Sequence, residues 1–582
     1  MVNLTIDNTP VSCAEGTTIM NAAASAGISI PHLCYLKDIN EIAACRMCTV
    51  EVEGTERLVP ACDNVVQPGM VVHTNSPRVR EARRINAELI MSQHNGSCIS
   101  CVRSGNCSLQ TLCNDLNILD GNPFKPDIPV KRWDMKAPLI HDASKCIKCL
   151  RCVNVCSKIQ DMQIWDLEGS GGHAHIDVTL GRNIMNSDCT FCGQCVINCS
   201  TGALRERDDT DEVFDALADP SKIVIAQVAP SARTSWNEDF GLSNSEAGAG
   251  RLVSALKKLG FDYVFDTNTG ADLTIMEEAA EFLERMQNPD KYTKPMFTSC
   301  CPAWVRFMKS QYPDMVPQLS TTKSPHQILA SAVKAWFRDV EGVDPHNIFM
   351  VSIMPCLAKK AECAEPNQND ACGDPDVDIS LTVREMNRML RSDQINPALL
   401  PVSEFDGPFG IASGAGKIFG VTGGVMEAAL RTAYYDATGR NPDPDAFRNV
   451  RGMEGWKEAE IDFSGAKIKV AVVSGLLNTR NLIEALRAGR VHYDFVEVMA
   501  CPGGCSGGGG MPIHDGWSMT DSRGSELYKL DKDSEIRFSH ESPVMKRLYG
   551  EYIGAPLSEK AEELLHTDHE GWEMPLNPRL TR

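Results

Sequence analysis

The stretch Cys146-Ile-Lys-Cys149-Leu-Arg-Cys152-Val-Asn-Val-Cys156 sets four cysteines at short, regular intervals. The same spacing returns in Cys189-Thr-Phe-Cys192-Gly-Gln-Cys195-Val-Ile-Asn-Cys199. Paired runs of this form hold two 4Fe–4S clusters, and the fourth cysteine of each run binds the other cluster. Zinc sites more often show two separated cysteine pairs than four cysteines in one run. The repeat therefore predicts two clusters, bound by Cys146, Cys149, Cys152 and Cys199, and by Cys156, Cys189, Cys192 and Cys195.

The composition indicates a large globular protein that handles metals. A chain of 582 residues is too long for one hydrophobic core and predicts several domains. Its formal charge of −20 argues against nucleic acid or an anionic membrane surface as a partner. No apolar run is long enough to span a bilayer, and the first residues lack a secretory signal pattern, so we expect a cytoplasmic protein. In a reducing compartment, the 24 grouped cysteines indicate metal binding or catalysis rather than disulfides.

Residues 1–78 predict a small α+β domain with a 2Fe–2S cluster. Strand patterns at Val2–Ile6, Cys48–Val52 and Met70–Thr74 accompany a helical pattern at Thr18–Ala26. Four cysteines in this setting suit a 2Fe–2S site, although the first gap, of ten residues, is longer than in plant-type ferredoxins. The expected ligands are Cys34, Cys45, Cys48 and Cys62.

Residues 79–138 predict a further iron–sulfur site and a connector. Ser76-Pro77 opens a basic amphipathic helix at Arg78–Met91, and a new cysteine group follows. The spacing leaves the fourth ligand open. Cys113 would complete an all-thiolate set, whereas His94 would supply an imidazole and raise the reduction potential. The other three expected ligands are Cys98, Cys101 and Cys107.

The composition changes after Asp208, where strand and helix patterns begin to alternate. This alternation predicts a layered α/β domain. We expect a two-cluster domain at 139–208, the large α/β domain at 209–565 and a polar tail over the surface at 566–582. The clearest patterns lie at Ile223–Val228, Gly248–Leu259, Val264, Leu273–Met286, Ile348–Met354 and Val383–Leu390.

Five cysteines of the large domain lie in three loops that each follow a strand pattern. Loops at the carboxyl ends of strands build active sites in α/β folds. In the last loop, glycines surround both cysteines and would let the backbone approach a bulky inorganic group closely. The loops are Thr298-Ser-Cys-Cys-Pro-Ala-Trp304, Met354-Pro-Cys-Leu-Ala-Lys-Lys-Ala-Glu362 and Met499-Ala-Cys-Pro-Gly-Gly-Cys-Ser-Gly-Gly-Gly-Gly-Met-Pro512.

These loops resemble the signatures of the iron-only (di-iron) hydrogenases, TSCCPxW, MPCxxKxxE and ExMACxGGCxxGGG. The likeness covers nearly the whole chain, because the cysteine array before the loops also matches the long clostridial-type members. It implies ferredoxin-like iron–sulfur domains followed by a two-lobed α/β catalytic domain. The implied activity is reversible oxidation of dihydrogen at an H-cluster, a 4Fe–4S cubane joined to a di-iron unit with CO, cyanide and a dithiolate amine bridge.

The resemblance also implies a role for each matching position. Lys359 would donate to an iron-bound cyanide, and His94 is selected over Cys113. The cofactor set would be one 2Fe–2S cluster, three accessory 4Fe–4S clusters and the H-cluster. Cubane ligands would be Cys301, Cys356, Cys501 and Cys505, of which Cys505 also bridges to the di-iron unit. The matching pocket positions are Ala229, Pro230, Ser231, Pro325, Met354, Phe419 and Met499.

Neighbouring residues of an extended chain point to opposite sides, so the two adjacent cysteines of the first loop can rarely bind one metal. With Cys301 as the ligand, the resemblance implies that Cys300 relays a proton to the bridging amine. The relay would continue through Glu278, Ser320, Glu281 and Arg285. By itself, the helix that carries Glu278, Glu281 and Arg285 is more typical of a solvated, ion-paired surface.

Two positions depart from the family, Met511 and His326, where glutamine is common. The third loop, with Pro502, resembles hydrogenases that assemble with flavin- and NAD(P)-binding subunits and a thioredoxin-like iron–sulfur subunit; ferredoxin is the other expected electron partner. The run Gly414–Gly420 lacks the Ser or Thr of a phosphate-binding loop, so NAD(P) would bind a partner.

Two alternatives compete with the enzyme. Residues 1–206 also resemble the large iron–sulfur subunit of respiratory NADH dehydrogenases, which would make the chain an electron-transfer subunit. The late cysteine loops argue against this. A hydrogen sensor or assembly factor of the same superfamily would tend to lose the relay cysteine, which is present here. Cys13, Cys363 and Cys372 have no assigned role.

Overall fold

The structure is a computed structural model that describes residues 1–118, 123–125, 127–452, 455–463, 465–515 and 517–576. The chain divides into two compact units. Unit 1 contains Met1–Met185 and Gln194–Arg205, and unit 2 contains Asn186–Gly193 and Glu206–Arg582. Among the described helices, none has both the length and the apolar character needed to cross a membrane.

Unit 1 begins with a five-stranded sheet in the order β2-β1-β5-β3-β4. Strands β1 and β2 form an antiparallel hairpin, whereas β1 and β5 are parallel. Helix α1 (Ile19–Ser25) is capped by the Thr18 side chain and buries Ile19 and Met20 in the core of this sheet. The expected α+β fold is confirmed. The strands are β1 (Val2–Ile6), β2 (Thr9–Cys13), β3 (Thr49–Val52), β4 (Val59–Pro60) and β5 (Val71–His73).

The rest of unit 1 consists of short elements around the cysteine groups. Helix α2 (Pro77–Met91) begins at the Ser76 cap, as the sequence predicts, and α3 (Ser108–Asp115) follows Cys107. Two small sheets pair β6 with β9 and β7 with β8. These elements are β6 (Leu139–His141), α4 (Arg151–Lys158), β7 (Trp165–Glu168), β8 (His175–Val178), α5 (Gln194–Ile197) and β9 (Leu204–Glu206).

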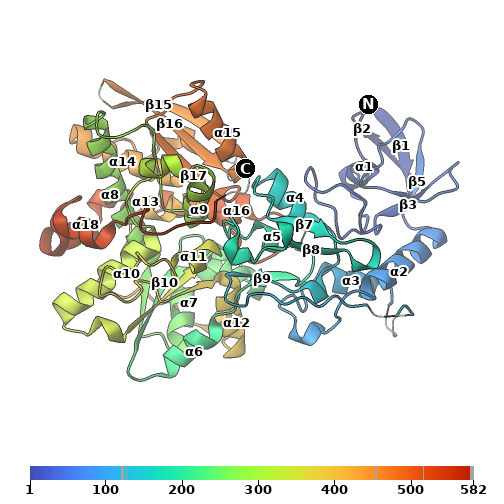
Figure 1. Ribbon diagram of the computed structural model, residues 1–582, viewed down its shortest axis with the longest axis horizontal. Coiled ribbons are helices and arrows are strands. Elements are labelled where there is room, and N and C mark those ends of the chain that lie inside the picture. The colour runs from blue at the N-terminus through green and yellow to red at the C-terminus, as the bar shows by residue number, and fades with distance from the viewer. Residues whose placement is uncertain (119–122, 126, 453–454, 464, 516, 577–582) are drawn as a thin grey trace. The chain divides into compact units, whose positions relative to one another are not determined.

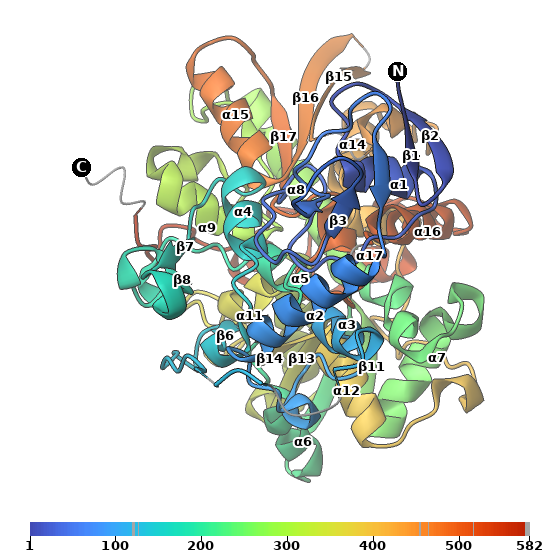
Figure 2. The ribbon, with the colours of Figure 1, turned by 90° about the vertical axis from the view of Figure 1, so that its right-hand side faces the viewer.

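Unit 2 contains two four-stranded sheets, which Figures 1 and 2 show in separate lobes. The first sheet is parallel throughout, in the order β11-β10-β13-β14. The second has the order β12-β17-β16-β15, with β15 antiparallel to β16. This confirms the two-lobed α/β prediction. The strands are β10 (Ile223–Val228), β11 (Tyr263–Asp266), β12 (Met296–Phe297), β13 (Ile348–Met354), β14 (Ile379–Thr382), β15 (Trp456–Phe463), β16 (Ala466–Ser474) and β17 (Phe495–Met499).

Helix α8 (Thr267–Gln287) connects the two lobes of unit 2. It packs against α10 (Pro325–Trp336), which covers the first sheet, and against α14 (Gly424–Thr438), which covers the second. The helix starts six residues before the predicted Leu273, because the Asp266 side chain caps it at Asn268. It is buried along most of its length, so it needs no amphipathic stripe to be stable here.

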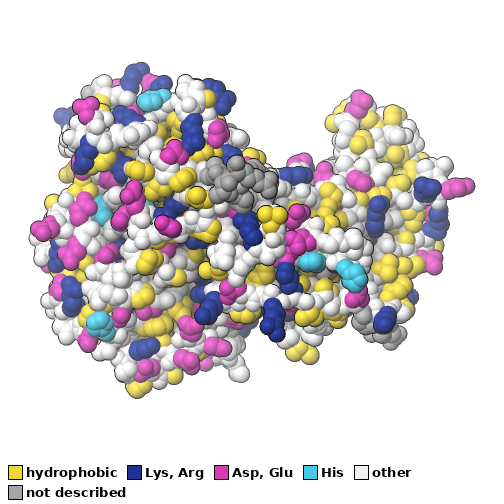
Figure 3. All heavy atoms as spheres, in the orientation of Figure 1, with side chains coloured by type: hydrophobic (Ala, Val, Ile, Leu, Met, Phe, Trp, Pro, Cys, Tyr) yellow, Lys and Arg dark blue, Asp and Glu magenta, His cyan; other side chains and the backbone are white. Residues whose placement is uncertain are grey.

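Helices cover both sheets of unit 2. The predicted helix at Gly248–Leu259 begins earlier, at Asn244, because Ser243 and Glu246 form a capping box. The remaining helices are α6 (Thr210–Ala218), α7 (Asn244–Leu259), α9 (Pro302–Gln311), α11 (Ala358–Glu362), α12 (Val383–Ser392), α13 (Gly414–Lys417), α15 (Leu476–Arg487), α16 (Thr520–Lys532), α17 (Pro543–Leu548) and α18 (Glu559–Leu565). On the face drawn in Figure 3, acidic and basic side chains are mixed.

The segment after α18 differs from the expected surface tail. His566, Thr567 and Met574 are buried, and the backbone at Thr322 forms a β-bridge with His566. The polar composition of this segment concealed these contacts, because His566 and Thr567 are satisfied by hydrogen bonds within the protein rather than by water. Residues 577–582 lie outside the described part of the chain.

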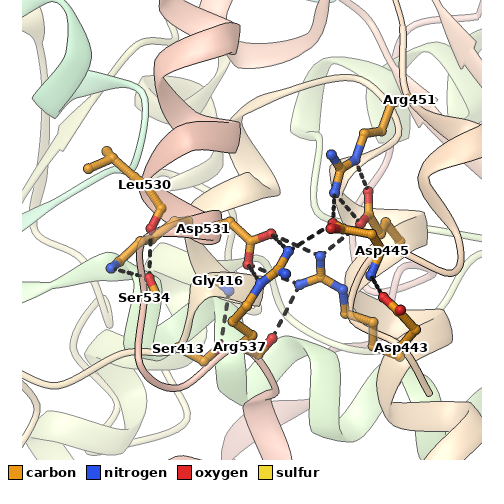
Figure 4. A network of polar contacts seen from close by, with 12 residues as sticks. Ser413, Gly416, Asp443, Asp445, Arg451, Leu530, Asp531, Ser534 and Arg537 are labelled. Atoms are coloured by element: carbon orange, nitrogen blue, oxygen red, sulfur yellow. Dashed lines mark hydrogen bonds and ion pairs between the residues drawn. The ribbon is translucent and has the colours of Figure 1, made fainter. Parts of the chain in front are cut away.

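A buried ionic network ties α16 to α14 within unit 2 (Figure 4). Asp531 accepts hydrogen bonds from Arg431 at 2.9 and 3.1 Å and from Arg537 at 2.6 Å. Arg431 also pairs with Glu427 at 2.7 Å, and Arg451 pairs with the same glutamate. A charge in this interior is stable only while its partners remain, because the lost hydration is not replaced otherwise.

We expect Asp531→Ala to destabilise unit 2 by about 3–5 kcal/mol, since two arginines would lose their shared carboxylate inside the protein. Calorimetry of the unit 2 transition measures the effect as a lower melting temperature. Asp533→Ala, an exposed change at the end of the same helix, is the control and should shift stability by less than about 0.5 kcal/mol. Equal melting temperatures for the two variants would contradict the structural role of the network.

Candidate active site

Three strand ends of unit 2 deliver cysteines to one cavity. Cys301 follows β12 and caps the start of α9, Cys356 follows β13, and Cys501 and Cys505 follow β17. All four line a cavity of about 80 Å³. Strands β12 and β17 are parallel neighbours, so their carboxyl ends meet at one edge of the sheet. The structure thus brings together four residues that are up to 204 positions apart in the sequence.

Glycines let the third loop lie against its neighbours, backbone to backbone. A Cβ at Gly508 would come within 2.1 Å of the Pro355 carbonyl oxygen, beside Cys356. Gly504 has φ +80°, and a Cβ there would meet the Thr422 amide at 2.7 Å. A larger residue at either position would push Cys501 or Cys505 out of the cavity. The glycine-rich sequence is therefore a packing requirement rather than a flexible loop.

The four thiols have the chemistry of a metal-binding set. Burial raises the pKa of Cys356 to about 12, and the charge of Cys301 adds to that rise. The pKa values of Cys301 and Cys501 are raised as well, chiefly by burial. A bound metal deprotonates its thiol ligands and supplies the positive charge that four buried thiolates need. Soft sulfur donors in this number fit an iron–sulfur cluster.

The remaining pocket positions that the sequence singled out also line this cavity. Most are apolar, so a group bound here would be shielded from water on that side. The lining residues among them are Ala229, Pro230, Ser231, Pro325, Met354, Phe419 and Met499. Met511, the other departure from the family, is buried in the core of the first sheet and accepts from the Ser235 hydroxyl at 3.2 Å.

Lys359 brings a positive charge to the wall of the cavity. Its Nζ lies 2.7 Å from Glu362 Oε2 and 3.3 Å from the Cys300 carbonyl oxygen. Burial alone would lower the pKa of Lys359, but the charge and hydrogen bond of Glu362 more than offset it, so the pKa is raised. Lys359 is therefore a buried ammonium group with one carboxylate partner.

His326 shares that carboxylate, which the sequence did not predict. Its Nε2 lies 2.6 Å from Glu362 Oε2, and its Nδ1 lies 3.0 Å from the Ser352 hydroxyl. Burial and the charge of Lys359 lower the pKa of His326 to about 4, so the ring is neutral at pH 7. Both ring nitrogens are engaged, which fixes the ring at the cavity wall. The one available signal was the spacing of Lys359 and Glu362, three residues apart on a helix.

Behind Cys300, the structure places the four other residues of the expected relay in the protein interior. Glu278 is fully buried, and its pKa is raised well above the usual range by burial and by the charges of Glu281 and Glu497. The Ser320 hydroxyl donates to Glu281 Oε2 at 2.6 Å, and Arg285 Nη2 lies 2.5 Å from Glu281 Oε1. The solvated-surface reading of this helix is therefore wrong.

The comparisons with known proteins decide the family. Residues 222–509 match the model of the iron-only hydrogenase large subunit, C-terminal domain, and residues 518–572 match the iron hydrogenase small subunit. The chain is 44% identical to the NADP-reducing hydrogenase subunit HndD of Solidesulfovibrio fructosivorans, over 98% of this chain and 99% of that protein. The chain belongs to the iron-only hydrogenase family.

Further relatives agree with this assignment. The hydrogenase is 39% identical to Iron hydrogenase 1 of Clostridium pasteurianum, over 97% of this chain and 99% of that protein. A solved structure of a variant of the FeFe-hydrogenase HydA1 from Chlamydomonas reinhardtii aligns with a TM-score of 0.56 at 40% identity, covering 62% of this chain and 98% of that chain. The chain is an enzyme that acts on dihydrogen, so the pure electron-transfer alternative is set aside.

Three family models describe the N-terminal part of the hydrogenase. Residues 1–77 match a 2Fe-2S iron-sulfur cluster binding domain, and residues 138–200 match a 4Fe-4S dicluster domain. Residues 83–121 match the NADH-ubiquinone oxidoreductase-G iron-sulfur binding region, which accounts for the resemblance to NADH dehydrogenases. These matches confirm that the hydrogenase carries both 2Fe–2S and 4Fe–4S clusters.

The cysteines of unit 1 form groups that fit such clusters. Cys146, Cys149, Cys152 and Cys199 line one cavity of about 20 Å³, as the crossed pairing of the two runs predicts. In the N-terminal α+β part of unit 1, Cys34, Cys45, Cys48 and Cys62 lie outside the strands and are all buried. Cys34 and Cys45 interact so closely that the pKa of Cys45 is lowered to about 6 while that of Cys34 is raised.

Cys189 and Cys192 belong to a segment of unit 2, whereas Cys156 and Cys195 belong to unit 1. The joint site of these four cysteines therefore stays a prediction. Within unit 2, the Cys192 carbonyl oxygen lies 3.8 Å from Cys501 Sγ, and Arg306 donates to the Cys189 carbonyl. The segment Asn186–Gly193 of unit 2, which carries these two cysteines, thus reaches the wall of the candidate active site.

Both candidates for the ligand at residues 79–138 are suitably placed. The His94 Nδ1 lies 3.1 Å from the Lys145 carbonyl oxygen, which orients the ring and leaves Nε2 available to a metal. Burial raises the pKa of Cys113 to about 11, with smaller contributions from the charges of Cys107 and Cys98. The selection of His94 stays a prediction.

We expect Glu362→Gln to destabilise the catalytic unit by about 3–5 kcal/mol, because the Lys359 ammonium would remain buried without a carboxylate. The amide keeps the size of the side chain, so the effect reports the charge. The midpoint of denaturant unfolding, followed by tryptophan fluorescence, measures it. Glu341→Gln, an exposed change, serves as the control, and equal midpoints would show that the pair contributes nothing.

Proposed function

We propose that the hydrogenase catalyses reversible dihydrogen oxidation and proton reduction at an H-cluster held by Cys301, Cys356, Cys501 and Cys505. The observation that carries this is the meeting of four cysteine sulfurs at one apolar cavity, with Cys300 and Lys359 in the same wall. When bound there, the di-iron unit would supply the Lewis-acid and redox chemistry that splits dihydrogen. The protein residues then have to orient the cofactor, exclude water and move protons.

Lys359 and the apolar lining would orient the di-iron unit. The ammonium is aligned by Glu362 and can donate to a cyanide ligand, while its charge balances a cofactor that carries anionic ligands. The apolar side chains keep water out, which strengthens that interaction. Cys505 would bridge the two parts of the cofactor from the glycine-rich loop.

Cys300, Glu278, Ser320, Glu281 and Arg285 would form the proton path. Burial and the charge of Glu278 raise the pKa of Cys300 well above its usual range, so the thiol holds a proton at neutral pH. The raised pKa of Glu278 keeps its carboxyl protonated too, so it can both donate and accept. Ser320 would transfer the proton to Glu281 along their 2.6 Å hydrogen bond. Arg285 would stabilise the Glu281 carboxylate that forms between transfers.

Electrons would leave through the accessory clusters. The contact between Cys192 and Cys501 supports the proposal that the cluster bound by the second cysteine run would be the first step of this path. We assign one 2Fe–2S cluster to residues 1–78, a His94-ligated 4Fe–4S cluster to 79–138 and two 4Fe–4S clusters to 139–208. The catalytic domain is assigned to 209–565 and the C-terminal segment to 566–582.

A cytoplasmic complex with NAD(P) chemistry is the proposed setting. The relative HndD is named as a subunit of an NADP-reducing hydrogenase, and it matches this chain end to end. We therefore propose a flavin- and NAD(P)-binding subunit and a thioredoxin-like iron–sulfur subunit as partners, with ferredoxin as the other electron carrier. Dihydrogen and protons are the substrates.

Replacement of Cys300 by alanine should abolish turnover while the infrared bands of iron-bound CO and cyanide remain. The reason is that the change removes the member of the proposed relay that lines the cavity but no proposed cofactor ligand. Turnover with an artificial electron acceptor and infrared spectra of the anaerobic protein test this. Cys363→Ala is the matched control and should keep activity. Retained turnover in Cys300→Ala would contradict the relay assignment. Absent bands in the unchanged protein would contradict the H-cluster assignment.

Replacement of His94 by alanine should remove one 4Fe–4S cluster, whereas Cys113→Ala should leave the iron content unchanged. The reason is that only a ligand is essential for cluster retention. Iron analysis and electron paramagnetic resonance of the reduced protein compare the two variants. The opposite pattern, with iron lost only in Cys113→Ala, would make this an all-thiolate cluster.

A further inference from the structure

The segment after α18 lies along the part of the chain that carries Ser320. The Lys323 amide donates to the Leu565 carbonyl at 2.9 Å, and the Thr567 amide donates to the Thr321 carbonyl at 2.7 Å. His569 Nε2 lies 2.8 Å from the Ser320 carbonyl oxygen. On the other side, the Ser320 amide donates to Phe297 in β12 at 2.8 Å. Ser320–Lys323 is therefore held between the second sheet and the C-terminal segment.

His566 is the most constrained residue of this segment. Its side chain is 4% exposed, and each ring nitrogen has a partner. Nδ1 lies 2.8 Å from the Thr321 hydroxyl, and Nε2 lies 3.1 Å from Glu277 Oε2. Glu277 is fully buried on α8, one residue before Glu278, and also accepts from the Tyr549 hydroxyl and the Leu557 amide. His566 thus links helix α8, which carries Glu278, to the segment Ser320–Lys323.

Thr321 transmits this link to the proton path. Its amide donates to both carboxylate oxygens of Glu281, at 3.2 Å each, while its hydroxyl contacts His566. The same carboxylate receives the Ser320 hydroxyl on one oxygen and Arg285 on the other. A shift of Thr321 would rotate this carboxylate and lengthen the contact between Ser320 and Glu281, along which the proton moves.

We propose that His566 is a positioning residue of the proton relay, which fixes Thr321 so that Glu281 stays in line between Ser320 and Arg285. The proposal rests on the relay assigned under the proposed function. It gives the C-terminal segment a role in catalysis, although none of its residues touches the cavity among the residues that the structure describes.

The charge state of His566 gives this contact a pH dependence. Burial alone would lower its pKa, but Glu277, with smaller contributions from Glu562 and Glu281, raises the pKa above the usual value. Tyr549 faces the same carboxylate. Because the folded pKa is raised, the stability that the charged pair of His566 and Glu277 adds is complete below about pH 6.5 and is lost as the pH rises through the folded pKa. Above that pH, one ring nitrogen loses its proton and only one of the two contacts keeps a donated N–H from the ring.

The test compares His566→Phe with His540→Phe, the same substitution at a half-buried histidine that stacks on Tyr435 instead. With an artificial acceptor in excess, His566→Phe should lower kcat for dihydrogen oxidation about tenfold or more, because misplacement near 1 Å has effects of this size. The solvent deuterium isotope effect should rise, and the KM for dihydrogen and the infrared bands should stay unchanged. His540→Phe should match the unchanged protein in all four measurements.

A second variant keeps the proposal testable if His566→Phe folds poorly. Thr321→Val retains the amide that donates to Glu281 but removes the hydroxyl that contacts His566, so it should change kcat and the isotope effect in the same direction. The high-pH decline of kcat should be present in the unchanged protein and absent in His566→Phe. Unchanged kcat and isotope effect in both variants would overturn the positioning role.

Glu281→Gln separates this inference from the proposed function. If Glu281→Gln slows turnover and His566→Phe does not, the relay stands and the positioning role of His566 falls. If Glu281→Gln leaves turnover and the isotope effect unchanged, the relay itself falls, and the inference falls with it.

Discussion

Four cysteine sulfurs in one apolar cavity are the constraint on which the catalytic unit depends. Burial raises the pKa of each thiol, so the set can become four thiolates only when a cationic group is bound among them. Because the sulfurs come from three separate strand ends, cofactor binding also fixes the loops that carry them. The two sheets of unit 2 therefore have to be complete before the site exists, and the glycines of the third loop allow the close approach that completes it.

Buried charges elsewhere in unit 2 likewise depend on nearby groups of opposite charge. Lys359 depends on Glu362, and Asp531 depends on Arg431 and Arg537, each inside the protein. Buried pairs of this kind contribute little net stability compared with apolar packing, but the loss of one member is costly. Such groups define one arrangement of the side chains. Around the cavity this is useful, because a wall that does not rearrange would hold a bound cofactor in one orientation.

The sequence was sufficient where the information is local. Ile223–Val228 and Ile348–Met354 are apolar runs interrupted only by Gln227 and Ser352, and both form strands with the predicted bounds, because the buried strands of a parallel sheet need little else. The cysteine spacings predicted the metal sites for a similar reason. The surface reading of the helix with Glu278 and Arg285 failed, because burial of that helix depends on α10 and α14, which no pattern within the helix reports.

The sequence alone could not predict contacts between residues that are far apart in the chain. Nothing in the polar composition after Leu565 indicates that His566 meets Glu277, 289 positions earlier, or that His326 shares a carboxylate with Lys359. Both histidines act through a second residue, so their importance is a matter of geometry rather than of motif. A sequence reading that recognises ligands and relay groups will omit the residues that hold them in place.

The two adjacent cysteines of the first loop have different proposed roles, one in electron transfer and one in proton transfer, although a single peptide bond joins them. On the proposed assignment, Cys301 would hold the cubane while Cys300, on the opposite side of the chain, would pass protons toward α8. The proposed electron path then continues from the cubane toward Cys192, and the proposed proton path continues from Cys300 toward Glu278. Because Lys359 also contacts the Cys300 carbonyl, the backbone between the two cysteines is held by the group that orients the cofactor. A change at Lys359 would then disturb proton and electron transfer together, whereas a change at His566 would disturb proton transfer alone.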